Sequence, residues 1–313
     1  MNLLTKIPLL KAQNQIDYSS QLLILGSCFS ENIGAKLEYF KFQRLQNPFG
    51  ILFHPLAIQK LIQKSVHQEV FTEKDVFHVN EQWHSFDAHS VLSNPSKEKI
   101  IDDLNEAVQN TSSQLKKASH IIITLGTAWV YRNSASEKVV ANCHKVPQAN
   151  FTKELLNVDD VKESLERTIE MVRSINPAAQ FIFTVSPVRH LKDGFVENQL
   201  SKSHLISAVH KVLNDGISYF PSYEIMMDEL RDYRFYAKDM IHPNEVAVDY
   251  IWGKFCEVWI VTNVYPTMKK IEKIQKGILH KPFNEKSEQH QKFLIKLNVL
   301  KSEINKEYPD LVF

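Results

Sequence analysis

The sequence predicts an α/β protein with three layers, in which a central, mainly parallel sheet lies between two layers of helices. Three apolar runs of strand length support this prediction, at residues 22–26, 120–126 and 180–187. Parallel strands that are buried on both faces have such continuous apolar runs. Helix-period patterns separate the runs, and strands that alternate with amphipathic helices form a sheet covered on both faces.

The composition is that of a globular protein with no strong overall charge. Of the 313 residues 43% are hydrophobic, and 37 basic against 36 acidic residues leave a formal charge of +1. This balance argues against binding to nucleic acid or to an anionic membrane. Three cysteines without CxxC spacing argue against a disulfide framework and suit a reducing compartment. Because no signal-peptide core or run near the ~18 apolar residues of a membrane span is present, we expect a soluble, cytoplasmic protein.

The first strand and helix place two reactive residues at one turn. The run from Leu22 stops at Gly26, and Ile33 and Leu37 then begin a helical spacing. Ser27 and Cys28 therefore follow the carboxyl end of a strand and begin a helix, where unpaired N–H groups and the helix dipole favour an anion. A thiol at such a place is biased towards thiolate. The alternative is a small buried cysteine that packs as a hydrophobe.

The remaining elements follow in order. Residues 46–55 form a loop rich in turn residues, and residues 70–96 form an irregular, aromatic excursion over the face of the sheet. Further helical spacings include residues 100–118, a helix capped by Asp159 or Asp160, and a final helix that opens at His242-Pro243. Residues 223–227 are predicted to be another strand. We place a domain at residues 1–262 and a charged, helical C-terminal extension at residues 263–313, without recognisable chemistry.

A second motif carries the base for a possible catalytic site. Asp239 and His242 stand three residues apart, directly before Pro243, and can lie on one side of a turn. The carboxylate can then accept from one imidazole nitrogen and leave the other free to take a proton. The alternative is an ordinary capped helix start. Ligands bind at the edge where the strands of a parallel sheet end. The Asp–His pair is a candidate base because the turn with Ser27 and Cys28, a candidate nucleophile, is predicted at the same edge.

Several short blocks together resemble a known family. Residues 26–30 read Gly-Ser-Cys-Phe-Ser, which is similar to the motif of the GSCFA family, a group within the SGNH/GDSL hydrolase superfamily. Further blocks that resemble the family lie at residues 47–50, 124–129, 141–145, 185–190, 193–194, 198, 201–202, 219–224, 228–236 and 239–243. The resemblance spans about residues 20–260 and implies the flavodoxin-like, three-layer fold of SGNH hydrolases.

The resemblance also implies roles for individual residues. The superfamily's nucleophilic serine falls on Cys28, so that acyl transfer would run through a thioester. Ser27 remains a rival nucleophile if the turn is shifted by one residue. Asp239 and His242 correspond to the acid and base of the superfamily's last block, and Gly50 to the glycine whose N–H helps to bind the oxyanion.

One expected donor is missing from the resembling site. The block that holds the oxyanion-binding asparagine in the superfamily falls on residues 126–129, where Ala128 takes its place. Removing one such donor can lower turnover roughly 10²–10³-fold. Thr127, Asn142 and Asn47 are the candidates to supply the missing hydrogen bond, and the sequence leaves the choice open.

Other polar residues have both a functional and a structural interpretation. His144 and His190 lie in loops and either bind substrate or serve the structure. Residues 231–236 carry two arginines, an aspartate and two tyrosines, for which an internal network that supports the His242 turn is favoured over a sugar or carboxylate surface. No ligand spacing supports a metal site; a zinc site is therefore disfavoured for Cys143, His144, His84 and His89.

The predicted activity is hydrolysis of an ester, such as an O-acetyl group of a carbohydrate or small metabolite. Cys28 or Ser27 would attack, with His242 as general base and Asp239 holding its ring. No metal or organic cofactor is expected. Two alternatives stay open: an acyltransferase with an aromatic lid around Trp83, and a non-catalytic binding protein on the same fold. The oligomeric state is left open.

Overall fold

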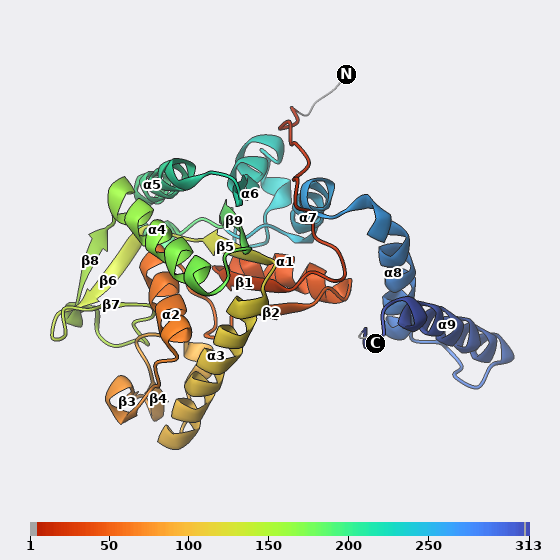
Figure 1. The fold of residues 1–313 in the computed structure, drawn as a ribbon, viewed down its shortest axis with the longest axis horizontal. Helices are drawn as coiled ribbons and strands as arrows, with labels where there is room; N and C mark the ends of the chain where they lie inside the picture. The colour runs from red at the N-terminus through yellow and green to blue at the C-terminus, as the bar shows by residue number, and fades with distance from the viewer. Residues whose placement is uncertain (1–4, 310) are drawn as a thin grey trace.

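The computed structural model describes residues 5–309 and 311–313 and confirms the predicted α/β fold. Its centre is a five-stranded sheet in the order β10-β9-β5-β1-β2, in which all neighbouring strands run parallel (Figure 1). This is the flavodoxin-like order, which places ligands beyond the carboxyl ends of the strands. The five strands are β1 (Leu22–Gly26), β2 (Arg44–Gln46), β5 (His120–Leu125), β9 (Gln180–Val185) and β10 (Ile217–Phe220).

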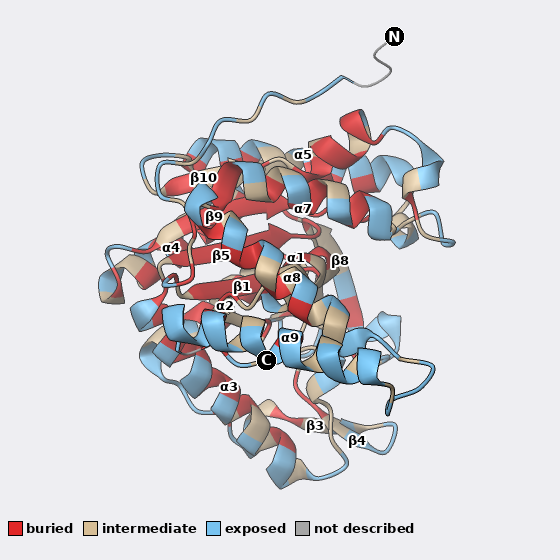
Figure 2. Cartoon of the chain, turned by 90° about the vertical axis from the view of Figure 1, so that its right-hand side faces the viewer, coloured by how far each residue is buried: buried red, intermediate tan, exposed pale blue. Residues whose placement is uncertain are grey.

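Helices cover both faces of the sheet. The α-helices are α1 (Cys28–Tyr39), α2 (Pro55–His67), α3 (Lys97–Lys117), α4 (Val158–Ile175), α5 (Phe195–Val212), α6 (Ser222–Glu224), α7 (Glu245–Trp259), α8 (Tyr265–Leu279) and α9 (Glu288–Glu307). Helices α2, α3, α4 and α5 share one core with the sheet, and α1, α7 and α8 share the other. Figure 2 shows the buried sheet between helices whose outer faces are exposed.

The alternation of side chains along each strand builds these two cores. In β1, Leu23 and Leu25 enter the core of α2 to α5, whereas Leu22 and Ile24 enter the core of α1 and α7. Successive side chains of a strand point to opposite faces, so an unbroken apolar run is what a doubly covered strand requires. The continuous apolar run of β1 is therefore explained by the burial of both faces of the strand.

The predicted strand at residues 223–227 is wrong. The strand at this place is β10, which begins after Gly216 at a φ of +85° and ends at Phe220. Residues 222–229 are instead helical, as α6 followed by a π-helical turn over Ile225–Glu229. A short apolar run does not distinguish a strand from a buried helical segment, and here the consecutive residues Ile225 and Met226 are both fully buried.

Two helices begin at asparagine rather than at the predicted residues. Asn157 caps α4, because its side-chain oxygen accepts from the N–H groups of Asp159 and Asp160, and Asp160 returns a bond in a capping box. Asn244 caps α7, which therefore begins two residues after His242-Pro243. Asparagine is as good an N-cap as aspartate, so composition alone does not locate these helix starts.

Two small antiparallel sheets lie outside the central one. The segment predicted as irregular contains a hairpin of β3 (Phe77–Val79) and β4 (Gln82–His84). A three-stranded sheet of order β7-β6-β8 follows β5; its strands are β6 (Trp129–Asn133), β7 (Val139–Val140) and β8 (Phe151–Leu155). It extends one edge of the molecule directly beyond the carboxyl end of β5 (Figure 1).

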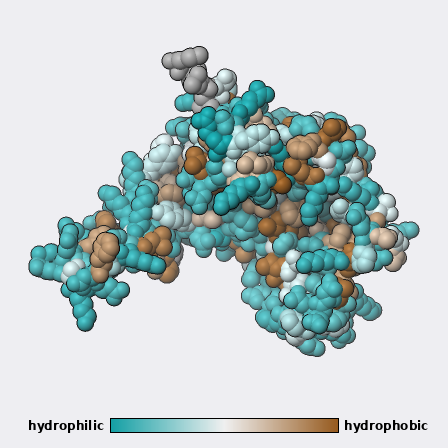
Figure 3. Space-filling view, turned by 180° about the vertical axis from the view of Figure 1, so that it is seen from behind, coloured by the Kyte–Doolittle hydropathy of each residue, from teal (hydrophilic) through white to brown (hydrophobic). Residues whose placement is uncertain are grey.

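The C-terminal helices form the predicted extension. Helices α8 and α9 pack on each other through Ile271, Leu297 and Ile304, which are buried. The pair projects from the main body, and Figure 3 shows its mostly hydrophilic surface. Among the described residues no helix is both long and apolar enough to cross a bilayer.

Candidate active site

The turn between β1 and α1 is held on two sides. Gly26, with a φ of +130°, donates its N–H to Oδ1 of Asn47 at 2.9 Å and accepts from the N–H of Leu52 at 3.0 Å. The N–H of Ser27 donates to the carbonyl of Thr124 in β5 at 3.0 Å. The turn is therefore fixed against both neighbouring strand ends, and it presents Cys28 as the first residue of α1.

The surroundings of Cys28 oppose the predicted bias towards thiolate. Burial raises the pKa of the Cys28 thiol above its usual value, and this effect outweighs the opposing influence of the nearby Lys202 ammonium and of the N–H groups of Cys28 and Phe29. The predicted thiolate followed from the helix start alone, whereas removing the half-buried sulfur from water disfavours its charged form. The sulfur still faces these N–H groups, so an anion formed there meets hydrogen-bond donors.

Asp239 and His242 form the hydrogen bond that their spacing predicts. Oδ2 of Asp239 lies 2.6 Å from Nδ1 of His242, and both side chains are about half exposed, at 47% and 49%. Oδ1 of Asp239 accepts from the N–H groups of Ile241 and His242 at 2.9 and 3.0 Å. These bonds lower the pKa of Asp239 to about 2. The carboxylate thus stays charged and orients the ring, and in the described residues Nε2 of His242 has no hydrogen-bond partner.

The backbone, rather than the arginines, supports the His242 turn. The N–H of Ala237 donates to the carbonyl of His242 at 2.7 Å, and Nδ2 of Asn244 donates to the carbonyl of Arg234 at 2.7 Å. Arg234 itself pairs with Asp232 at 2.9 Å on the surface. The favoured internal arginine–aspartate network is therefore not what holds this turn.

His190 lies beside the turn that carries Ser27. Its N–H donates to Oδ1 of Asn198 at 2.8 Å, and its ring meets Phe53 edge-on with centroids 5.5 Å apart. Nε2 of His190 is enclosed and has no partner in the described residues. Burial, with added repulsion from Lys202 and His242, lowers the pKa of His190 to about 3. This histidine is thus neutral at physiological pH.

Lys202 has no predicted role, although its burial is the most unusual feature near the site. It is fully buried, and its Nζ donates to the carbonyls of Gly126 at 2.6 Å and Ser186 at 2.8 Å. Burial lowers the pKa of Lys202 to about 7, and a charge on Cys28 acts in the opposite direction. The apolar spacing of α5, which places Leu205, Ala208 and Val209 in the core, does not reveal that Lys202 is buried as well.

Ser27 is less accessible than Cys28. Its side chain is fully buried, and its hydroxyl has no hydrogen-bond partner in the described residues. A Cβ atom at Gly126 would lie 3.0 Å from Cβ of Ser27 and 3.4 Å from Nε2 of His190. The missing side chain of Gly126 therefore makes room for Ser27 and His190 to lie on either side of it.

Two of the proposed oxyanion donors are already engaged. The N–H of Gly50 donates to the carbonyl of Asn47 at 2.7 Å in a tight turn. The amide nitrogen of Asn47 donates to the hydroxyl of Ser30 at 2.9 Å and to the carboxylate of Glu31. Asn47 thus joins β1, α1 and the loop after β2.

The other two donors lie at the cavity beside the site. Thr127 donates its N–H to the carbonyl of Phe53 at 3.0 Å, and its hydroxyl lies 3.0 Å from that of Ser201. Oδ1 of Asn142 accepts from the N–H of His144 at 2.8 Å, whereas its NH₂ group has no partner in the described part of the chain. Asn142 is therefore the candidate with unused donors.

A cavity of about 550 Å³ extends from the site towards the antiparallel sheet. It begins at Phe53, Thr127 and His190 and is lined further out by Trp129 and Tyr131 of β6. Aromatic walls with a few polar groups are typical of small-molecule sites. The cavity therefore offers space for a ligand next to the carboxyl ends of the parallel strands.

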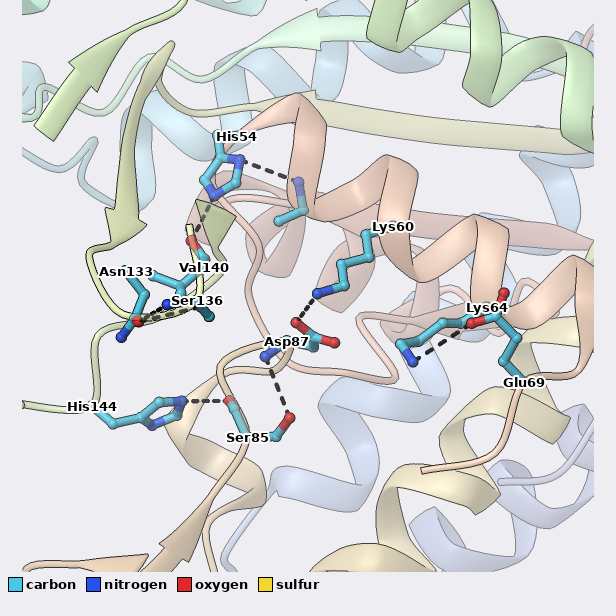
Figure 4. Close-up of polar contacts among 11 residues, drawn as sticks. His54, Lys60, Lys64, Glu69, Ser85, Asp87, Asn133, Ser136, Val140 and His144 are labelled. Carbon is cyan, nitrogen blue, oxygen red and sulfur yellow. Dashed lines mark hydrogen bonds and ion pairs between the residues drawn. The ribbon is translucent and has the colours of Figure 1, made fainter. Parts of the chain in front are cut away.

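His144 and His54 serve the structure. Nε2 of His144 lies 2.7 Å from the carbonyl of Ser85, and burial lowers its pKa to about 4 (Figure 4). His54 caps α2, because its Nδ1 accepts from the N–H of Ala57 at 3.2 Å and its Nε2 donates to the carbonyl of Val140 at 3.0 Å. Both rings thus join separate segments of the chain. In residues 5–309 and 311–313, no three histidine, cysteine or acidic side chains meet to hold a metal ion.

Acid is expected to destabilise the fold through His54. Complete burial lowers the pKa of this ring from 6.5 to about 4. Between these values the unfolded chain binds a proton and the folded chain does not, so stability is lost as the pH falls through this window. The loss is on the order of 3 kcal/mol. Urea unfolding at pH 7 and pH 4 measures it; His54→Asn should flatten the dependence, and the exposed control His210→Asn should not.

The fold and this cluster together define the class of the protein. It is an α/β protein of flavodoxin-like strand order with a thiol, a hydrogen-bonded Asp–His pair, a buried lysine and a neutral histidine among its strand-end segments. Comparison with family models then places it: residues 21–255 match the GSCFA family, so the chain belongs to this family. Residues 271–313 match the C-terminal domain of GSCFA domain proteins. No curated protein matches the chain.

Proposed function

We propose that this protein is an SGNH-like hydrolase that cleaves an ester through a covalent acyl-enzyme. The observation that carries the proposal is the Asp239–His242 hydrogen bond of 2.6 Å, which leaves Nε2 of the imidazole free. A histidine held in this way is suited to act as a general base. Family membership and the position of Cys28 at the start of α1 add support.

The proposed reaction has two halves. Sγ of Cys28 attacks the ester carbonyl as its proton passes to Nε2 of His242, and the imidazolium then protonates the departing alkoxide to leave a thioester on Cys28. A water molecule gives a proton to His242 and attacks the thioester. The imidazolium then returns this proton to the departing thiolate, which releases the acid and restores the thiol. The N–H groups of Cys28 and Phe29 face the sulfur and are suited to bind the oxyanion. Asn142 is the side chain with free donors for the missing asparagine.

The shape of the site favours a small or carbohydrate ester. The cavity of about 550 Å³ has aromatic walls at Trp129 and Tyr131 and amide groups at Asn142 and Gln148. Such a mixture suits a sugar ring, whose faces are apolar and whose edges carry hydroxyl groups. An O-acetyl group on a saccharide is therefore the substrate class that we favour.

The first test compares the two candidate nucleophiles. In assays with p-nitrophenyl acetate and an acyl thioester, Cys28→Ala is expected to lower turnover by about 10³-fold or more, because the acyl group has no sulfur to join. Ser27→Ala should retain most activity, since its hydroxyl is enclosed. Cys256→Ala is the matched control, because Cys256 lies in α7 and does not line the cavity, and it should behave as the unaltered protein.

The same assay can contradict the proposal. Loss of activity in Ser27→Ala with full activity in Cys28→Ala would move the nucleophile to Ser27. Full activity in both variants would exclude a covalent mechanism at this turn. Mass spectrometry of the intact protein after rapid quenching checks independently whether an acyl group is carried on Cys28.

A further inference from the structure

A second cleft adjoins the cavity of the candidate active site. Its volume is about 670 Å³, and it shares Asn142 and Lys145 with the cavity of about 550 Å³. It is lined by the β3–β4 hairpin and by the loop after β7, which a hydrogen bond of 2.7 Å from the N–H of Ala141 to the carbonyl of Phe86 holds together. Figure 1 shows the hairpin and the three-stranded sheet on the same side of the molecule. Because two residues line both spaces, they form one continuous groove, which we name the extended groove.

The extended groove is positively charged. Lys145 and Lys192 line it, and within the described residues neither ammonium has an ion-pair or hydrogen-bond partner. Among the described residues that line the groove, the one acid is Asp193, whose carboxylate already pairs with Nζ of Lys153 at 2.5 Å. The protein therefore provides no counterion for the two lysines. A cleft concentrates such a field on the molecule that enters it, so the groove favours an anionic ligand.

The outer part of the groove, at the second cleft, offers hydrogen-bonding groups instead of aromatic walls. All the side chains that line it are polar or charged. Those of Asn80, Gln82 and Ser90 make no hydrogen bond within the described part of the chain, and the NH₂ group of Asn142 is free as well. Amides and hydroxyls supply both donors and acceptors, which suits a ligand rich in hydroxyl groups. The inner cavity can thus hold one sugar ring against its aromatic walls, and the outer part can hold the units that follow.

We propose that the extended groove binds an acidic oligosaccharide, with an anionic group at Lys145 and Lys192 and further sugar units along Asn80 and Gln82. The choice of a saccharide rests on the proposed function, which the inference makes more specific: the substrate is an O-acylated, acidic glycan chain and not a neutral monosaccharide. The anionic group is a carboxylate or a phosphate, because a lysine ammonium binds either of them as a compact point charge.

Isothermal titration calorimetry with unacylated sugars tests the proposal without any reaction. Tetragalacturonate is compared with its neutral amide derivative, which keeps the length and stereochemistry of the chain. The acid is expected to bind about tenfold more tightly, which corresponds to one charge-assisted hydrogen bond. Added salt should reduce this difference. Galacturonate and galactose 6-phosphate distinguish a carboxylate from a phosphate, and both should bind more weakly than tetragalacturonate.

Variants assign the binding to the two parts of the groove. Lys145→Gln is expected to weaken tetragalacturonate binding by about tenfold and to leave the affinity for the amide unchanged. Asn80→Gly combined with Gln82→Ala should weaken the binding of both tetramers but not that of galacturonate. Glycine is chosen because residue 80 has a φ of +50°, and all three side chains are exposed, so the variants should fold. Lys116→Gln is the matched control, because this exposed lysine in the last turn of α3 does not line the groove.

Three results would overturn the proposal: no binding of tetragalacturonate or equal affinity for its amide, unchanged affinity in Lys145→Gln, or a tetramer that binds no more tightly than galacturonate. The outcome is separate from that of the proposed function, because binding needs no catalysis. A protein that binds tetragalacturonate but cleaves no ester would refute the hydrolase alone. An active esterase that does not bind it would refute the role of the groove alone.

Discussion

Asp239→Asn is expected to lower ester turnover by about 10³–10⁴-fold while leaving the fold intact. The amide cannot compensate the imidazolium that forms as His242 takes the proton, and it can hold the ring in the wrong tautomer. The carboxylate is suited to this task because its pKa is lowered to about 2. It therefore remains charged at every pH at which the proposed activity would be assayed, and a loss of activity in mild acid would not come from Asp239.

Steady-state hydrolysis of p-nitrophenyl acetate measures the effect, with His242→Ala as the companion variant that removes the base itself. Asp232→Asn is the matched control, because Asp232 is also an exposed carboxylate that caps a short turn and contacts one cation. Turnover that survives in His242→Ala would contradict the proposed mechanism. Turnover that falls equally in Asp232→Asn would show that the segment, rather than the Asp–His pair, is needed.

Gly26→Ala is expected to cause the largest loss of stability among single substitutions near the site. A Cβ atom at this position would overlap the carbonyl oxygen of Thr124 and lie 2.8 Å from the backbone N and C atoms of the same residue. The φ of +130° is also strained for any residue with a side chain. Because β5 is central and cannot move aside, the free energy of unfolding should fall by about 4 kcal/mol.

Urea unfolding followed by circular dichroism measures this loss. The control is Gly253→Ala in α7, where a Cβ atom meets nothing within 4 Å. Alanine is the better helix former, so this control should gain about 0.5–1 kcal/mol. A Gly26→Ala protein that is as stable as the unaltered one would show that the turn can adopt another conformation.

The fold could be predicted because its strands are buried on both faces. The continuous apolar runs of β1, β5 and β9 have no other simple explanation, and the helices between them have clear periodicity. The antiparallel strands β6 to β8 escaped prediction because they are short and partly exposed, so their pattern is weak. The segment at residues 223–227 was assigned to the wrong class because length alone could not separate a strand from a buried π-helical turn.

The candidate site could be predicted only where the chemistry is local. Asp239 and His242 are three residues apart, so their hydrogen bond follows from one turn. The states of Cys28, Lys202 and His190 depend on burial and on partners brought together from different strand ends, which no spacing reveals. Desolvation raises the pKa of the Cys28 thiol, whereas its place at a helix start had predicted a lowered pKa. The burial of Lys202 is likewise evident only from the folded structure.

The two halves of the site rest on supports of unequal rigidity. The thiol half belongs to the central sheet and is clamped by backbone bonds from two strand ends, whereas the Asp239–His242 turn is half exposed, with Met240 at a φ of +59°. Segments of this second kind open locally at a smaller free-energy cost than the core. In the proposed mechanism the Asp239–His242 turn could therefore detach while Cys28 stays in place, and proton transfer would be the step that local opening of the protein limits.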